Sequence, residues 1–114
     1  MRRTNIIAVL LGLVVFHAVG LKTVTAAAKR TLEGQIVEFQ CGDNCYLTIK
    51  TTGGKEESGL CAARECKNWV EKAEMPISFV GKRVRVTLGT GAQLDANGKV
   101  ARHMASFDSI QFLR

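Results

Sequence analysis

Four cysteines constrain the fold of this chain more than any other feature of its sequence. Cys41 and Cys45 flank a Gly-Asp-Asn turn, and Cys61 and Cys66 follow after one further hairpin's length of chain. Cysteines at these spacings suit either two disulfides or one tetrahedral zinc site with four thiolate ligands. The folding compartment decides between the two, because disulfides form and persist in oxidising surroundings.

The first 28 residues have the pattern of a secretory signal peptide. Basic residues at positions 2–3 precede an almost wholly apolar run over 6–21, and three alanines end the segment at 26–28. This order is typical of cleaved export signals. A retained membrane anchor is less favoured, because the run is shorter than the roughly 20 residues that span a bilayer. We therefore predict a cleaved signal peptide over 1–28, an exported protein (periplasmic or secreted), and one mature domain over 29–114 without a membrane segment.

The predicted mature domain is small and only mildly basic. Cleavage after residue 28 leaves 86 of the 114 residues, and the loss of three basic residues with the leader lowers the formal net charge from +6 to +3. That charge is too low for a dedicated nucleic-acid binder. So small a domain buries only part of its unfolded surface and is marginal without a covalent or metal staple.

Export favours disulfides over zinc as that staple. The preferred pairing joins Cys41 to Cys45 and Cys61 to Cys66, because these bridges close the shortest loops. The alternative pairing joins Cys45 to Cys61 and Cys41 to Cys66. The spacings within the pairs are wider than the two-residue spacing usual in four-cysteine zinc sites. Neither pair is the Cys-x-x-Cys of a thiol redox enzyme.

Alternating apolar and polar residues predict five strands. Leu32 and Ile36 differ in parity from Val37 and Phe39, so the first strand needs a bulge or bend within residues 34–37. The strands are expected over residues 31–40, 46–51, 56–61, 82–88 and 105–113. Their other inward-facing residues are predicted to be Leu47, Ile49, Val84, Val86, Leu88, Ile110 and Phe112.

One helix and one long loop are expected between these strands. A stripe at i, i+3, i+4 and i+7 indicates a helix over 64–74 that Pro76 ends; its members are Cys66, Trp69, Val70 and Ala73. Residues 89–104 are rich in small residues and are predicted to form a long loop with a turn at Asn97-Gly98. Gly53-Gly54 predicts a tight hairpin turn between the second and third strands.

Five short strands with one helix between the third and fourth form the plan of the OB-fold. We therefore predict an all-β domain with one short helix, a five-stranded OB-fold-like Greek-key barrel of order β-β-β-α-β-β. Segments 32–37, 46–50, 81–86 and 108–110 resemble strands of small exported bacterial OB-fold proteins, the periplasmic stress-associated family. The resemblance implies a small periplasmic binding domain without catalytic residues. The four cysteines are additional to the pattern of that family.

OB-folds bind ligands on the face of strands two and three, between the loops that join strands one to two and four to five. Here residues 42–44 and 89–104 would form those loops. Arg83 and Arg85 stand two apart on an outward strand face, where they could bind an anion. The candidate ligand-binding residues are therefore Tyr46, Thr48, Lys50, Arg83, Arg85 and Arg102.

The remaining motifs do not indicate an enzyme. Tyr46 is the only aromatic residue expected to point outward, and this disfavours single-stranded nucleic acid, which needs several stacking platforms. His103 is the only histidine of the predicted mature domain, so it has no second histidine there to form a metal or acid–base site with. Asp95 to Gly98 lacks the remaining ligands of a calcium loop. We predict a non-catalytic domain without metal or cofactor. Its partner would be a small anionic or sugar-like ligand or an envelope protein.

The alternative functions are an accessory protein–protein factor, such as an inhibitor or assembly protein, and a zinc-stabilised four-cysteine domain. A concave surface around Tyr46 and Lys50 would favour a small ligand. A projecting segment over residues 89–104 would favour a protein partner. No pattern in the sequence specifies an oligomeric state.

Overall fold

A computed structural model describes residue 12 and residues 29–114 of the chain. The predicted leader over 1–28 therefore lies, apart from Gly12, outside the described residues, and its cleavage stays a prediction. Among the described residues, no helix combines the length and the apolar character that crossing a bilayer requires.

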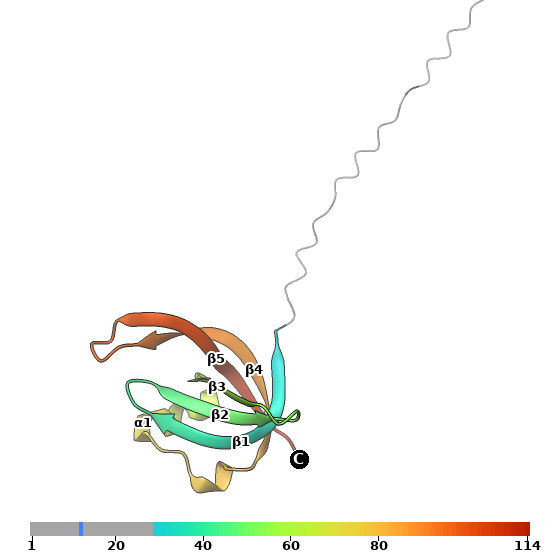
Figure 1. The fold of residues 1–114 in the computed structure, drawn as a ribbon, viewed down its shortest axis with the longest axis horizontal. Coiled ribbons are helices and arrows are strands. Elements are labelled where there is room, and N and C mark those ends of the chain that lie inside the picture. The colour runs from blue at the N-terminus through green and yellow to red at the C-terminus, as the bar shows by residue number, and fades with distance from the viewer. Residues whose placement is uncertain (1–11, 13–28) are drawn as a thin grey trace, which may run out of the picture.

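Five strands close into a barrel (Figure 1). The strand order is β1-β2-β3-β5-β4, and β4 pairs back onto β1. β3 and β5 run parallel, and every other pair is antiparallel. The strands are β1 (Thr31–Cys41), β2 (Cys45–Thr51), β3 (Glu56–Cys61), β4 (Arg83–Leu94) and β5 (Val100–Phe112). With the single α-helix between β3 and β4, this confirms the predicted OB-fold-like barrel.

β1 belongs to two parts of the barrel. Its first half pairs with β4 over Thr31–Gln35, and its second half pairs with β2 as far as Cys41. The register shifts between Ile36 and Glu38, which confirms the predicted bulge. The extra residue reverses the alternation, so Ile36 on one side of the bulge and Phe39 on the other both pack on the core.

The core consists of the alternating residues of β2, β4 and β5. Leu47, Ile49, Val84 and Val86 are fully buried, as predicted, around the buried ring of Phe107. Ile110 is also buried. The prediction was wrong for Phe112, which is 39% exposed. Phe112 is the last residue of β5, where its ring packs against Phe79 at a centroid distance of 5.6 Å and lies under the Lys82 ammonium at 5.8 Å.

The segment between β3 and β4 is less helical than predicted. A 3-10 turn η1 (Arg64–Cys66) leads into α1 (Lys67–Lys72), and a second 3-10 turn η2 (Ile77–Phe79) follows Pro76. Cys66 and Trp69 are buried, but Val70 is 42% exposed. Ala73, which was expected to extend the same stripe, is exposed and ends α1 in the left-handed conformation. The tighter 3-10 turn and the early end explain why only two of the four residues face the core.

Trp69 closes one end of the barrel. Its ring makes edge contacts with Phe39, at a centroid distance of 6.0 Å, and with Phe79, at 4.8 Å. The Lys82 ammonium lies over the Phe79 ring at 4.7 Å from the centroid. These contacts hold α1 and η2 against β1.

The prediction of a long loop over 89–104 was wrong. β4 continues to Leu94 and β5 begins at Val100, so only five residues, Asp95 to Lys99, connect them. The predicted turn at Asn97-Gly98 is present, with Gly98 at a φ of 77°. The Asp95 carboxylate accepts hydrogen bonds from the N–H groups of Asn97 and Lys99. The result is a β4–β5 hairpin that extends beyond the barrel (Figure 1).

Close packing explains the small residues of this hairpin. A Cβ at Gly89 would lie 1.9 Å from the Asp108 carboxylate, and a Cβ at Gly91 would lie 2.8 Å from Leu60 Cδ1. Glycines interrupt the strand-like alternation, so they concealed the strand in the sequence. Their actual role is to let the hairpin approach β3 and β5.

Candidate functional site

All four cysteines form disulfides. The bridges are Cys41–Cys45 and Cys61–Cys66, with Cα–Cα distances of 4.1 and 5.7 Å, and this is the pairing preferred from loop length. The alternative pairing is not formed. No free thiol is left for a four-cysteine zinc site. The bridges stand at the β1–β2 turn and at the junction of β3 with η1.

The β1–β2 turn is fastened to the end of the β4–β5 hairpin. Asn44 Nδ2 donates to the Leu94 carbonyl at 2.7 Å, and the Leu94 N–H donates to Asn44 Oδ1 at 2.9 Å. The two residues are 50 positions apart in the sequence. The two loops that border the expected binding face are therefore in contact with each other.

Tyr46 faces outward, as expected, but the hairpin covers its hydroxyl. Gln93 Nε2 donates to Tyr46 Oη at 2.5 Å, and Arg102 Nε donates to Gln93 Oε1 at 2.6 Å. The fold thus brings the candidates Tyr46 and Arg102 together through Gln93. Sequence reasoning missed Gln93, because its contact with Tyr46 spans 47 residues and depends on β4 extending to Leu94, which the sequence did not predict.

The other two candidates of β2 lie further along the strand. Thr48 Oγ1 is 2.6 Å from Ser58 Oγ on β3, so the two hydroxyls share a hydrogen bond. Lys50 is exposed near the end of β2, opposite Glu56 of β3. The expected binding face is therefore split into a part covered by the hairpin and an open part at Lys50.

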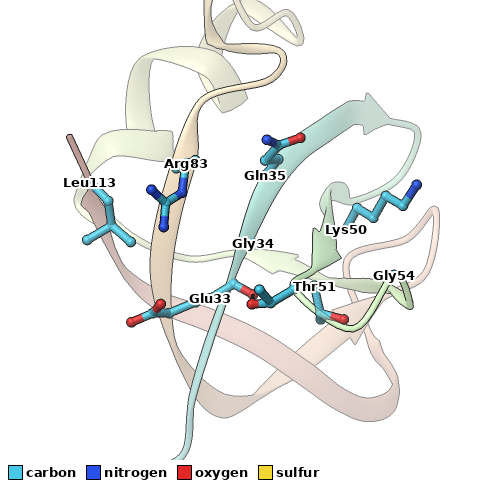
Figure 2. A pocket seen from close by; sticks show the side chains of 9 residues that line it. Glu33, Gly34, Gln35, Lys50, Thr51, Gly54, Arg83 and Leu113 are labelled. Carbon is cyan, nitrogen blue, oxygen red and sulfur yellow. Dashed lines mark hydrogen bonds between the residues drawn. The ribbon is translucent and has the colours of Figure 1, made fainter.

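Lys50 lines a cavity of about 310 Å³ at this end of β2 (Figure 2), here called the cationic cavity. Arg83 of β4 lines the same cavity from the other side of Gly34. In Figure 2 the Lys50 ammonium points away from Arg83, so the two cations do not meet across the cavity. The complete lining is Glu33, Gly34, Gln35, Lys50, Thr51, Thr52, Gly54, Arg83 and Leu113.

Arg85, which was predicted to bind an anion together with Arg83, already has partners of its own. Its Nε donates to Glu33 Oε1 at 2.8 Å, its Nη2 forms an ion pair with the same oxygen, and its Nη1 donates to Gln111 Oε1 at 3.3 Å. The only carboxylate that lines the cavity is thereby balanced. Neither Lys50 nor Arg83 has an ion-pair partner within residues 29–114. The cationic cavity therefore carries an excess of positive charge.

A second cavity, of about 350 Å³, lies between the β1–β2 turn and the hairpin. We call it the turn–hairpin groove. Asp43 is the only charged residue in its lining. The complete lining is Asp43, Asn44, Cys45, Leu60, Cys61, Ala62, Val70, Gly91, Ala92 and Ser106. The two cavities are at opposite ends of β2 and differ in charge.

Comparison of the chain with models of protein families, with curated proteins and with solved structures found no match. The function of the chain is therefore inferred from its fold and its two cavities.

Proposed function

We propose that this protein is an exported, non-catalytic binding domain that takes a small anionic or sugar-like ligand in the cationic cavity. One observation carries the proposal. Lys50 and Arg83 border the same cavity, while Arg85 balances the only carboxylate in its lining. The two disulfides are compatible with an oxidising compartment and so support export. The resemblance of four segments to small exported bacterial OB-fold proteins supports the same class.

The groups around the cavity suit a ligand that carries both an acid and hydroxyl groups. An arginine side chain binds a carboxylate through two parallel N–H donors, and a lysine adds a point charge. The Gln35 amide offers donors and an acceptor for sugar hydroxyls. The Thr51 hydroxyl, which accepts from the Lys55 N–H, keeps its proton to donate. The Thr52 hydroxyl, which donates to the Glu33 carbonyl, offers an acceptor. The volume lies at the lower end of the range for small-molecule sites, so a monosaccharide acid fits better than a longer chain.

Isothermal titration with glucuronate and with glucose tests this proposal. We expect glucuronate to bind and glucose to bind at least about tenfold more weakly, because only the acid engages Arg83. Arg83→Gln should weaken glucuronate binding by about tenfold or more. Arg102→Gln is the matched control, because Arg102 is bonded to Gln93 and does not line the cavity. Equal affinity of the two sugars, or equal effects of the two substitutions, would overturn the proposal.

A further inference from the structure

β4 has an edge that β1 leaves unpaired. The last contact between the two strands is the hydrogen bond from the Leu88 N–H to the Arg30 carbonyl, at 2.8 Å. Alternate residues of a strand direct their backbone groups to the same edge, so Thr90, Ala92 and Leu94 share this edge with Leu88. Thr90 and Ala92 are exposed, and no described strand pairs with them on this side.

Asn44 shows which chemical group this edge accepts. Its side-chain amide carries the same donor and acceptor as a peptide bond. It uses both on Leu94, at 2.7 and 2.9 Å, which is how a neighbouring strand bonds to one residue of an antiparallel pair. The Asn44 amide thus pairs with this edge at Leu94, and the Arg30 carbonyl pairs with it at Leu88. Between these two points, the N–H and C=O groups of Thr90 and Ala92 have no described partner.

The turn–hairpin groove adjoins this interval of the edge at Gly91 and Ala92, the two residues of β4 in its lining. Gly91 has no side chain there, and the buried Leu60 lies directly below it, 2.8 Å from the position that a Cβ would take. Val70, 42% exposed, is a second apolar residue of the lining. Asp43 supplies the only charge. The groove therefore suits an apolar side chain on a neutral or basic segment, and it disfavours an acidic one.

We propose that the turn–hairpin groove binds a short, extended, neutral or basic polypeptide segment of a partner protein by strand addition to β4. The segment would bond through its backbone to Thr90 and Ala92 and place one apolar side chain over Leu60. Backbone hydrogen bonds supply affinity in such complexes, and the side-chain pocket supplies specificity. This site is separate from the cationic cavity and does not depend on the function proposed for that cavity.

The probe is the peptide acetyl-Lys-Thr-Val-Thr-Lys-amide at millimolar concentration, followed by amide NMR on the folded protein with both disulfides intact. We expect saturable shifts and slower amide exchange at Thr90 and Ala92. A peptide N-methylated at its internal residues should bind about tenfold more weakly or not at all, because it cannot form the ladder. A peptide with Glu in place of both Lys should also bind more weakly, because of Asp43.

Gly91→Ala tests the groove within the protein, because its methyl group would lie 2.8 Å from Leu60 Cδ1 and so displace the Leu60 side chain that lines the groove. The matched control is Gly53→Ala, where the nearest atom to the new Cβ would be Thr51 Oγ1 at 3.9 Å. Of the two glycine substitutions, only Gly91→Ala should weaken peptide binding. Arg83→Gln should leave the affinity for the peptide unchanged. Three results would each overturn strand addition: no saturable shift at Thr90 and Ala92, equal binding of the N-methylated peptide, or equal effects of the two glycine substitutions.

Discussion

The two disulfides close loops of nearly equal length, yet they stand in different surroundings. Cys41 and Cys45 are four residues apart and half-buried at the β1–β2 turn. Cys61 and Cys66 are five residues apart and belong to the buried core cluster. The chain-entropy model assigns each bridge about 2 kcal/mol, because loop length is its only variable. Burial adds a folded-state contribution at Cys61–Cys66 that loop length does not contain.

The comparison also separates stability from binding. Cys61–Cys66 ties β3 to η1, next to the helix whose Trp69 closes the barrel. Cys41–Cys45 encloses the turn that presents Asp43 and Asn44 to the turn–hairpin groove. Each bridge contributes one cysteine to the lining of the groove, Cys45 or Cys61, but only Cys61–Cys66 belongs to the core cluster. We infer that Cys61–Cys66 mainly stabilises the core, whereas Cys41–Cys45 mainly shapes the turn beside the groove. Substitutions at both bridges and beside the two cavities test this difference.

Replacing both Cys61 and Cys66 by alanine should have the largest effect. We expect the free energy of unfolding to fall by about 3–5 kcal/mol, since the loss of the cross-link is joined by the loss of buried core volume. Urea denaturation, monitored by Trp69 fluorescence, measures this change in the free energy of unfolding. A loss no larger than that of the Cys41/Cys45 variant would contradict the assignment of this bridge to the core.

Replacing both Cys41 and Cys45 by alanine should lower the free energy of unfolding by about 2 kcal/mol or less. The backbone hydrogen bonds between β1 and β2 stay in place, and little core volume is lost. The same denaturation measurement applies. Mild reduction followed by alkylation and mass spectrometry gives a second readout, in which Cys41 and Cys45 should be labelled before Cys61 and Cys66. Labelling in the reverse order would argue against the difference in accessibility.

Asn44→Ala should lower the free energy of unfolding by about 1 kcal/mol, because two hydrogen bonds to Leu94 are lost in a solvent-exposed setting. Amide exchange at Leu94 should become faster, while exchange in β2 stays unchanged. Asn44→Asp is the matched control: it keeps an oxygen acceptor for the Leu94 N–H but removes the donor to the Leu94 carbonyl. Identical exchange in Asn44→Ala and in the unsubstituted protein would mean that the turn does not hold the hairpin.

Glu33→Gln should have the smallest effect on stability, within about 1 kcal/mol, because the Arg85–Glu33 ion pair is exposed. The same change removes the only carboxylate of the cationic cavity, so glucuronate should bind severalfold more tightly, most clearly at low salt. Glu71→Gln, on the exposed side of α1, removes the same charge at a residue that does not line the cavity. Tighter binding in that control would show that net charge, and not the cavity, governs affinity.

Local patterning predicted the parts of the fold whose neighbours in sequence are also neighbours in space. The alternation around Leu47 and Ile49 and the Gly53-Gly54 turn are satisfied within the β2–β3 hairpin, so their strands followed from the sequence. The irregularity in β1 followed from a conflict of parity within the strand, which predicted a bulge or a bend, and the structure has a bulge there. The extension of β4 past Leu88 was not predictable from the sequence. Its glycines are explained by Asp108 and Leu60, which are distant in sequence.

The residues of the candidate site also differ in how far the sequence could predict their role. Arg83 and Arg85 have nearly identical local sequence, so both were equally good anion-binding candidates. Only Arg83 lines the cavity, because Glu33, 52 residues away from Arg85, binds that guanidinium. Tyr46 was correctly placed on an outward face, but Gln93, 47 residues away, covers its hydroxyl.

The class of barrel and the turns between its strands were therefore predictable from local patterns, because they depend on periodicity and on turn chemistry over a few residues. The tertiary structure alone decided which cysteine pair is buried, which arginine is free of a carboxylate, and how far the hairpin extends. These properties depend on contacts between residues about 20 to 50 positions apart. A local pattern contains no information about them, because such contacts form only when the barrel closes.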